Sequence, residues 1–195
     1  MHVDPDVYVP RWLSEPLARR AIDRLPPNGT AVDVCTGSGA IAAVLRANRP
    51  HARIVAIDVD PRAVACAVAN GVDAFAGDLF APLADDLAGH VDVIVGVVPY
   101  VPTPELPLLQ RDTFTFERPL SYDGGPDGTD ILRRVIREAP RYLHQGGALL
   151  LELGGNQAKL LDAELNDLDY ADVKVLTDED GDTRGIEATL GRSPD

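Results

Sequence analysis

A glycine-containing turn between an apolar segment and a helix-forming segment constrains the fold of this chain more than any other feature. The apolar residues 31–34 lead into Thr36-Gly37-Ser38-Gly39, and residues 40–47 then favour a helix with an apolar stripe. Glycines lack the Cβ atoms that would block a tight turn and keep a ligand away from the backbone. The helix that begins at Ala40 points its free N–H groups and positive dipole end at that ligand. This order of elements predicts a binding site at the end of the first strand.

A carboxylate follows the second apolar segment. Asp58 directly follows residues 53–57 and lies about 20 residues after Gly39. At this spacing an acidic side chain accepts hydrogen bonds from ribose hydroxyls. The pattern predicts a nucleoside-bearing ligand, and the alternative is a tight turn with no ligand. Asp33 in front of the turn affects the choice of ligand, because nicotinamide-binding turns usually carry an apolar residue there. The run Asp-x-x-x-Gly-x-Gly resembles instead the first motif of class I S-adenosylmethionine (SAM) methyltransferases, in which the helix end faces the methionine carboxylate.

Short apolar strands alternate with helices along the chain, which predicts a parallel α/β sheet with helices on both faces. All 195 residues are expected to form a single domain, without a separate substrate-recognition domain before it. A long excursion over the sheet is expected between Thr103 and Gly128. The expected strands are residues 31–34, 54–57, 72–76, 91–95, 148–153, 173–176 and 185–190, and the expected helices are residues 14–25, 40–47, 61–70, 129–143 and 156–166.

The formal net charge of −13 argues against a nucleic-acid partner and suits a basic protein or a small molecule, unless the excess charge only keeps the chain in solution. Cys35 and Cys66 match no zinc or thioredoxin spacing, so two reduced thiols in a cytoplasmic protein are expected. No segment approaches the ~20 apolar residues of a membrane span. No histidine pair has ligand spacing, so no metal is expected.

Six motifs together resemble the HemK/PrmC methyltransferases, which methylate the side-chain amide of a glutamine in peptide-chain release factors. The motifs are Val9-Pro10-Arg11 with Glu15, residues 33–42, Asp58-Val59-Asp60-Pro61, Gly77-Asp78-Leu79-Phe80, Asp123-Gly124-Gly125-Pro126-Asp127-Gly128 and residues 146–154. The resemblance implies a Rossmann-like class I methyltransferase fold with a mostly parallel seven-stranded sheet. It also implies SAM as methyl donor and S-adenosylhomocysteine (SAH) as product. The cofactor-binding residues that it implies are Asp33, Thr36, Gly37, Ser38, Gly39, Ala40 and Asp58, with Asp78 and Leu79 bordering the adenine.

The chain departs from the family after the fourth strand, where Val97-Val98-Pro99-Tyr100 replaces Asn-Pro-Pro-Tyr. In the family, the Asn side chain and the main-chain carbonyl after it hold the planar amide of the acceptor. A valine side chain can neither donate nor accept these hydrogen bonds. The four residues are expected to form the acceptor pocket, with Pro99 and Tyr100 as the catalytic pair and Tyr100 contacting the acceptor or the methyl group. For Tyr100 the alternative is a half-buried aromatic residue at a strand end.

Two function hypotheses therefore remain. The first is a methyltransferase that acts on a nitrogen of a protein, such as a release factor, or on a small molecule. The alternative is a SAM-binding protein that has lost catalysis and acts as a binding or regulatory module. Cys35 stands where the family usually has glycine, and its side chain is tolerated if the local φ is negative. Glu117 and Arg118 in the excursion are expected to be solvated charges outside the site.

Overall fold

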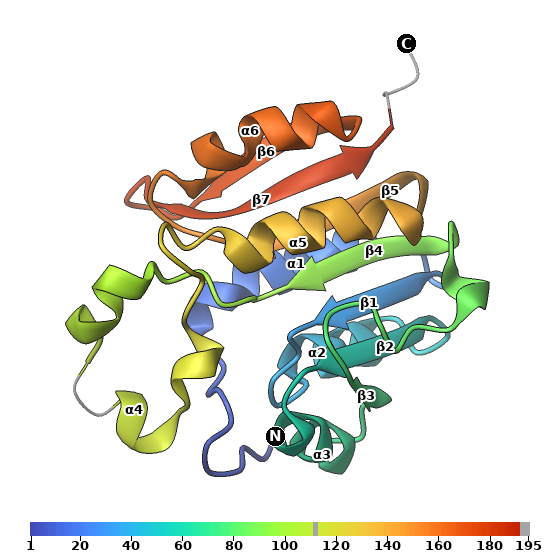
Figure 1. Cartoon of the computed structure of the whole chain (residues 1–195). Coiled ribbons are helices and arrows are strands. Elements are labelled where there is room, and N and C mark those ends of the chain that lie inside the picture. Colours follow the sequence, from blue (N-terminus) through green and yellow to red (C-terminus); the bar gives the residue numbers. More distant parts are fainter. Residues whose placement is uncertain (111–112, 192–195) are drawn as a thin grey trace.

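Seven strands form one sheet in a computed structural model, which describes residues 1–110 and 113–191 (Figure 1). The strand order is β3-β2-β1-β4-β5-β7-β6, and β7 alone runs antiparallel to its neighbours. The sheet is thus mostly parallel, which confirms the prediction. The strands are β1 (Thr30–Val34), β2 (Arg53–Asp58), β3 (Ala74–Ala76), β4 (Val91–Gly96), β5 (Leu143–Glu152), β6 (Tyr170–Thr177) and β7 (Thr183–Leu190).

Helices cover both faces of this sheet, as predicted. One face packs against α1 (Glu15–Arg24), α2 (Ala40–Asn48) and α3 (Pro61–Ala69), and the other against α5 (Asp130–Glu138) and α6 (Gln157–Asp167) (Figure 1). The buried strands read as nearly continuous apolar runs because both of their faces are covered. In β5, for example, Leu150 packs on the α1 side and Leu149 and Leu151 pack on the α5 side. The short helix α4 (Thr113–Phe116) lies in the excursion.

Several predicted boundaries differ from the structure. The helix expected over residues 129–143 ends at Glu138 and continues as a single 3₁₀ turn, Ala139–Arg141, because Pro140 has no N–H to extend the helix. Strand β5 accordingly begins at Leu143, before the glycine pair that was expected to precede it. At the edge of the sheet β3 is short, Ala74–Ala76, and residues 72 and 73, which were expected to belong to it, instead connect it to α3. Among the described residues, no helix has the length and apolar character needed to cross a membrane.

A negative φ was the condition under which the Cys35 side chain is tolerated, and the backbone does not meet it. Its φ is +56°, in the left-handed region, rather than negative. A residue with a Cβ pays roughly 1–2 kcal/mol for this conformation, which explains why glycine suits the position. Leu79 is also left-handed, with a φ of +46°. Cys35 follows β1 and Leu79 lies shortly after β3, so two of the five non-glycine residues with positive φ in the described part of the chain lie where parallel strands end.

Candidate active site

The strand register places four side chains in a row along the carboxyl edge of the sheet. The last residues that pair across β2, β1, β4 and β5 are Ile57, Val34, Gly96 and Leu151. The residues that follow them are Asp58, Cys35, Val97 and Glu152. The order of the strands reverses between β1 and β4, and open parallel sheets bind ligands beside such a reversal. This row is therefore the expected position of a ligand site.

Three adjoining pockets follow the row. The largest of their unfilled spaces is about 510 Å³, including space open to solvent, which falls within the range of small-molecule sites. Cys35 lines all three pockets, and Asp58, Val97 and Pro99 each line two of them. The pockets bring together most of the predicted site residues: Asp33, Thr36, Gly37, Ser38, Ala40, Asp58, Asp78, Leu79, Val97 and Pro99.

The Asp33 side chain stabilises the glycine turn by hydrogen bonds. Its Oδ2 accepts hydrogen bonds from Thr36 Oγ1 at 2.6 Å and from the backbone N–H of Ala42 at 3.1 Å. The carboxyl group is almost fully buried, and burial raises the pKa of Asp33 to about 7 although both hydrogen bonds oppose the rise. Asp33 thus joins the turn to the first turn of α2 and sets the direction of the helix.

The two glycines of the turn serve different purposes. Both have positive φ, +56° at Gly37 and +83° at Gly39, so the prediction of a tight turn is confirmed. A Cβ at Gly39 would lie 3.0 Å from Ala67 Cβ and 3.1 Å from Val72 Cγ2. Gly39 therefore makes room for α3 rather than for a ligand, and it lines none of the three pockets. Gly37 lines the first pocket, and an added Cβ there would meet only Tyr8 among the described residues, at 3.7 Å from its Cβ.

The start of α2 offers polar groups without partners. The N-cap residue Gly39 has no side chain to cap this helix. Among the helix N–H groups, Asp33 accepts only from the third, that of Ala42, so the N–H groups of Ala40 and Ile41 remain available. Ser38 beside it is 1% exposed, and its Oγ has no hydrogen-bond partner among the described residues. Ser38 and Ala40 line the same pocket. A carboxylate such as that of methionine fits this position, because it would satisfy the hydroxyl and face the positive end of the helix dipole.

Asp58 connects the second strand to the glycine turn. Its Oδ2 accepts from the N–H of Gly37 at 2.9 Å, and its Oδ1 accepts from the N–H of Asp60 at 2.9 Å. Burial raises the pKa of this carboxyl group. The two hydrogen bonds hold the side chain in one orientation at the border of two pockets. Carboxylate oxygens accept more than one hydrogen bond each, so Asp58 can also bind hydroxyl groups of a ligand.

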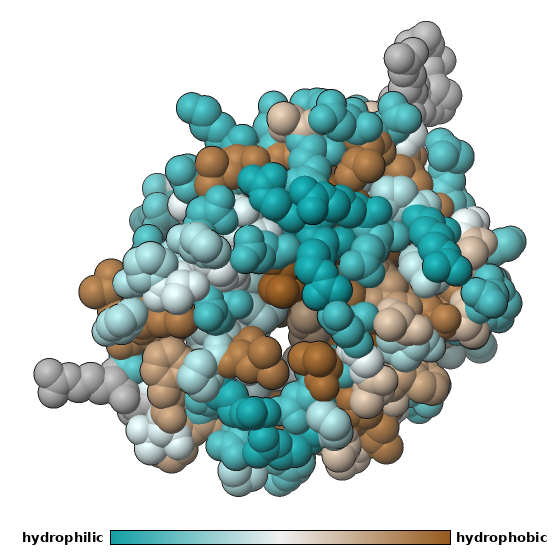
Figure 2. All heavy atoms as spheres, in the orientation of Figure 1, coloured by the Kyte–Doolittle hydropathy of each residue, from teal (hydrophilic) through white to brown (hydrophobic). Residues whose placement is uncertain are grey.

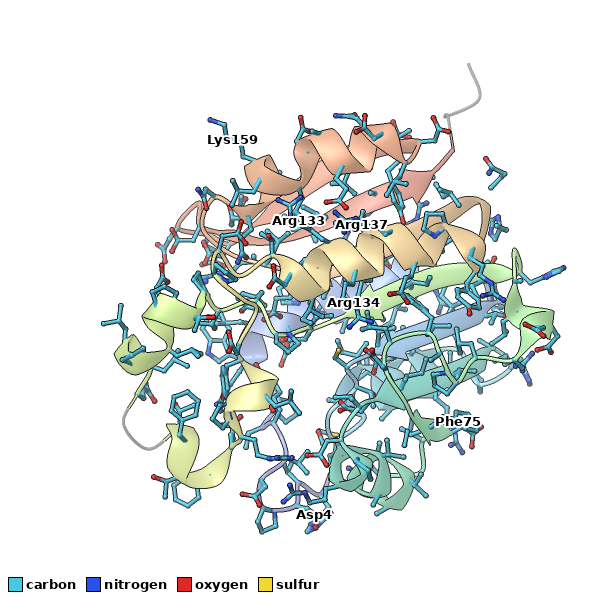
Figure 3. The ribbon with its side chains drawn as sticks, viewed as in Figure 1. Asp4, Phe75, Arg133, Arg134, Arg137 and Lys159 are labelled. Carbon is cyan, nitrogen blue, oxygen red and sulfur yellow. The ribbon has the colours of Figure 1, made fainter. Side chains whose placement is uncertain are left out.

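Asp78 is held by an arginine that the sequence reasoning did not include in the site. Both of its carboxylate oxygens accept from Arg134 of α5, at 3.0 and 2.9 Å. Figure 3 shows Arg134 on the side of α5 that faces away from α6, while Arg133 and Arg137 extend toward α6. Leu79, the residue after Asp78, is 5% exposed and lines the same pocket as Asp78. This pocket thus combines an apolar wall with a carboxylate.

The four residues after β4 point in different directions. Val97 and Pro99 line the pockets, whereas the side chain of Val98 is buried in the core on the α5 side. Tyr100 turns away toward β5, where its hydroxyl donates to Glu152 Oε1 at 2.9 Å. Burial and the nearby Glu152 carboxylate raise the pKa of Tyr100, so the phenol stays protonated. The sequence reasoning did not select Glu152, although its charge interrupts an otherwise apolar strand.

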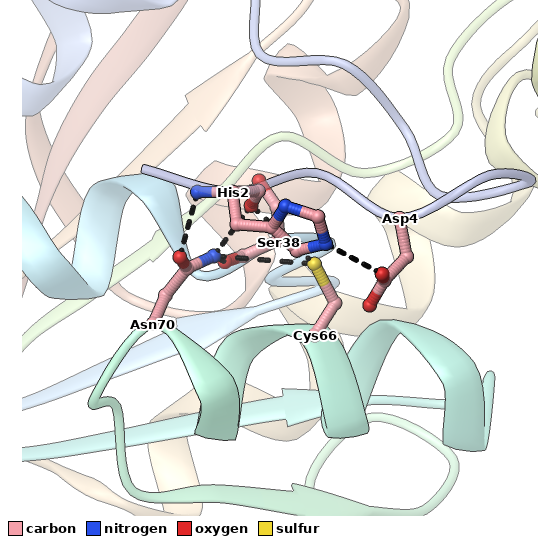
Figure 4. A network of polar contacts seen from close by, with 5 residues as sticks. All are labelled: His2, Asp4, Ser38, Cys66 and Asn70. Atoms are coloured by element: carbon pink, nitrogen blue, oxygen red, sulfur yellow. Dashed lines mark hydrogen bonds and ion pairs between the residues drawn. The ribbon is translucent and has the colours of Figure 1, made fainter.

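The N-terminal segment, residues 2–11, lies over the glycine turn. Asn70 at the end of α3 binds both: its Nδ2 donates to the carbonyl oxygens of His2 and Ser38, at 2.7 and 2.9 Å, and its Oδ1 accepts from the N–H of His2 (Figure 4). Farther along the segment, Val7 and Tyr8 line the first pocket. The segment therefore forms one wall of the site.

Glu117 is not the solvated charge that was expected. It is 5% exposed and accepts from the N–H of Val9 at 3.1 Å, from Tyr122 Oη at 2.6 Å and from Arg11. Arg118 is not free in solution either, since it pairs with Asp60 at 2.9 Å. These contacts join the excursion to the N-terminal segment across the site. No local pattern indicates them, because the partners of Glu117 in the N-terminal segment lie about a hundred residues away in the sequence.

We expect the Glu117→Gln variant to be less stable by about 1–3 kcal/mol, because Arg11 would lose its charged partner and an N–H group of the amide would face Arg11. Urea denaturation measures the loss, and limited proteolysis should cut the N-terminal segment sooner. Glu105→Gln, at an exposed position of the same excursion, is the control. Equal stability of the Glu117 and Glu105 variants would contradict the role of Glu117 as a clamp.

Within residues 1–110 and 113–191, no three His, Cys, Asp or Glu side chains come together in a way that could hold a metal ion.

Comparisons with known proteins agree with this geometry. Residues 15–97 match the family model described as "Methyltransferase small domain". The chain is 35% identical to the release factor glutamine methyltransferase of Geobacter sulfurreducens, covering 97% of this chain and 68% of the relative. It is 34% identical to the enzyme of the same description from Mycolicibacterium smegmatis, covering 97% and 69%.

Solved structures show the same fold. A chain of the E. cuniculi Mtq2-Trm112 complex aligns with a TM-score of 0.70 at 22% identity, covering 96% of this chain and 99% of that one. A protein-(glutamine-N5) methyltransferase from Alicyclobacillus acidocaldarius aligns with a TM-score of 0.57 at 26% identity, covering 98% and 100%. Nothing in these relationships supports a protein that has lost catalysis. The chain belongs to the release factor glutamine methyltransferase (HemK/PrmC) family and is a SAM-dependent methyltransferase.

Proposed function

We propose that this chain transfers the methyl group of SAM to the side-chain amide nitrogen of a glutamine in a peptide-chain release factor, leaving SAH. The observation that carries the proposal is the row along the carboxyl edge of the sheet. It leads from Asp58, beside the glycine turn at the start of α2, to Val97, and Pro99 just after Val97 lines the same pockets as Asp58. A donor and an acceptor bound along this row would meet at its centre. The relatives named as release factor glutamine methyltransferases supply the acceptor class.

The donor would be held at three points. Ser38 and the first N–H groups of α2 face its methionine carboxylate, and Asp58 accepts from its ribose hydroxyls. Asp78, oriented by Arg134, accepts from the adenine amino group while Leu79 packs on the base. When bound, SAM supplies a methyl group on a positively charged sulfur, which leaves as the neutral thioether of SAH.

The acceptor side must compensate for a poor nucleophile. The lone pair of an amide nitrogen is delocalised into its carbonyl, so orientation and matched polar contacts supply much of the catalysis. The backbone carbonyl of Val98 accepts one N–H of the amide, and Pro99 forms a wall against its flat face. Val97 adds an apolar wall and no hydrogen bond, which leaves a polar contact to be supplied from elsewhere.

Apolar side chains around the site suit a protein acceptor. Trp12 is 75% exposed, Phe116 is 64% exposed and Leu120 is 51% exposed, and Leu120 lines two of the pockets. Figure 2 shows hydrophobic side chains gathered in the lower half of this face, whereas the part over α5 and α6 is mostly hydrophilic. Exposed apolar groups of this kind favour docking of a protein surface.

The test is methyl transfer from radiolabelled SAM to the recombinant release factor of the source organism. We expect label on one glutamine, located by mass spectrometry, and none on a release factor in which that glutamine is replaced by alanine. A wild-type enzyme that binds SAM but labels no glutamine in the release factor would overturn the proposal.

A further inference from the structure

The side chain next to Val97 on the sheet is a carboxylate. Gly96 pairs with Leu151, so the following residues, Val97 and Glu152, occupy neighbouring positions on β4 and β5. Val97 packs with the cluster that contains Leu150, and side chains alternate along a strand, so Glu152 extends from the same face as Val97. Of the two carboxylates in the carboxyl-edge row, Glu152 belongs to the strand next to the position where the family has its asparagine, whereas Asp58 is two strands away.

Glu152 has one oxygen in use and one without a partner. The residue is 3% exposed, its Oε1 accepts from Tyr100 Oη, and its Oε2 has no hydrogen-bond partner among the described residues. An unpaired buried oxygen of this kind costs about 1–3 kcal/mol or more. Glu187, which is also buried in this sheet, differs because Arg20 and Arg24 neutralise it.

Ser14 lies between Glu152 and a pocket on the side of Val97. The Ser14 hydroxyl lies beside Glu152 and lowers the pKa of its carboxyl group by hydrogen bonding, although Ser14 Oγ and Glu152 Oε2 form no hydrogen bond of full geometry among the described residues. Ser14 and Val97 line the same pocket. Tyr8, Tyr100 and Arg184 are the other titratable groups that act electrostatically on or with Glu152, and burial raises its pKa overall. Through Ser14, the unpaired Oε2 of Glu152 thus lies close to this pocket, although Glu152 itself is not among the residues that line it.

We propose that Glu152 Oε2 binds the acceptor amide by accepting a hydrogen bond from its N–H group. In the family, the asparagine side chain makes the corresponding contact with the amide. The inference rests on the proposed function and adds the residue that replaces the missing polar contact. Tyr100 is a positioning residue in this arrangement, because it holds Oε1 and leaves Oε2 toward the acceptor. As the bond from nitrogen to the methyl carbon forms and the bond from that carbon to sulfur breaks, the nitrogen loses one proton. The Glu152 carboxylate takes that proton and then releases it to water.

The decisive variant is Glu152→Gln, which keeps the shape and the acceptor for Tyr100 but removes the charge. We expect kcat for the release factor to fall about 100-fold, while the Kd for SAM stays within about twofold. Glu187→Gln is the matched control: it removes a buried carboxylate from the same sheet away from the site, and should lower stability while kcat stays within about threefold. If the Glu152→Gln variant does not fold, Glu152→Asp provides the second variant, with an expected loss of about tenfold.

Rescue separates substrate binding from a structural role. Val97→Asn added to Glu152→Gln should restore kcat at least about tenfold over the single variant, because an amide at position 97 supplies the lost contact. An unchanged kcat in Glu152→Gln, or the absence of rescue, would overturn the inference while leaving the proposed function in place. A wild-type enzyme that labels no glutamine would instead overturn both.

Discussion

The Asp58→Ala variant is expected to bind SAM about 100-fold more weakly than the wild-type protein, a loss of roughly 2.8 kcal/mol. Asp58 lines two of the pockets and is held in place by the N–H groups of Gly37 and Asp60. Its carboxylate would accept from the ribose hydroxyls, and hydrogen bonds to charged groups contribute about 1.5–3 kcal/mol each. Isothermal titration calorimetry with SAM and with SAH measures the loss directly.

Asp92→Ala is the control for this experiment. Asp92 is also a strand aspartate that accepts a backbone N–H, from Thr30 at 2.8 Å, but it lies at the opposite end of the sheet. Its loss should lower stability without changing the affinity for SAM. If Asp58→Ala bound SAM as tightly as the wild-type protein does, the ribose-binding role of Asp58 would be wrong.

The Gly39→Ala variant is expected to lose about 2–4 kcal/mol of stability. The residue has a φ of +83°, and an added Cβ would lie within 3.2 Å of three atoms of Ala67 and Val72. Left-handed backbone and overpacking against α3 therefore act together. Thermal unfolding should show the loss as a Tm lowered by about 4–16 °C, using ~2–4 °C per kcal/mol for a chain of this size.

Gly181→Ala separates the two causes. Gly181 has nearly the same φ, +85°, but nothing lies within 4 Å of an added Cβ. We expect this control to lose only the backbone part, about 1–2 kcal/mol. If Gly39→Ala were as stable as the wild-type protein but no longer bound SAM, Gly39 would serve the ligand rather than the packing of α3.

The Asp58 variant tests the ligand-binding side of the glycine turn, and the Gly39 variant tests the side that packs against α3. This difference was not evident from the sequence. Gly37 and Gly39 have equal weight in the motif, yet only Gly37 lines a pocket. The reason is that the space around a Cβ depends on α3, which packs against the turn from another part of the chain. Similarly, Cys35 could be compared with the glycine of the family from the sequence, but its positive φ could not be predicted from it.

The sequence by itself determined the order of strands and helices, the mostly parallel sheet, and the carboxyl ends of β1, β2 and β4 as the place to expect a site, where three pockets lie. It could do so because apolar periodicity, glycine conformational freedom and the spacing to Asp58 are local properties. Only the tertiary structure decided which polar groups meet there: Arg134 on Asp78, Glu117 on the N-terminal segment, and Glu152 beside Val97. These contacts join residues from distant parts of the chain, and the hydrogen bonds of a buried carboxylate depend on which strands and loops pack around it.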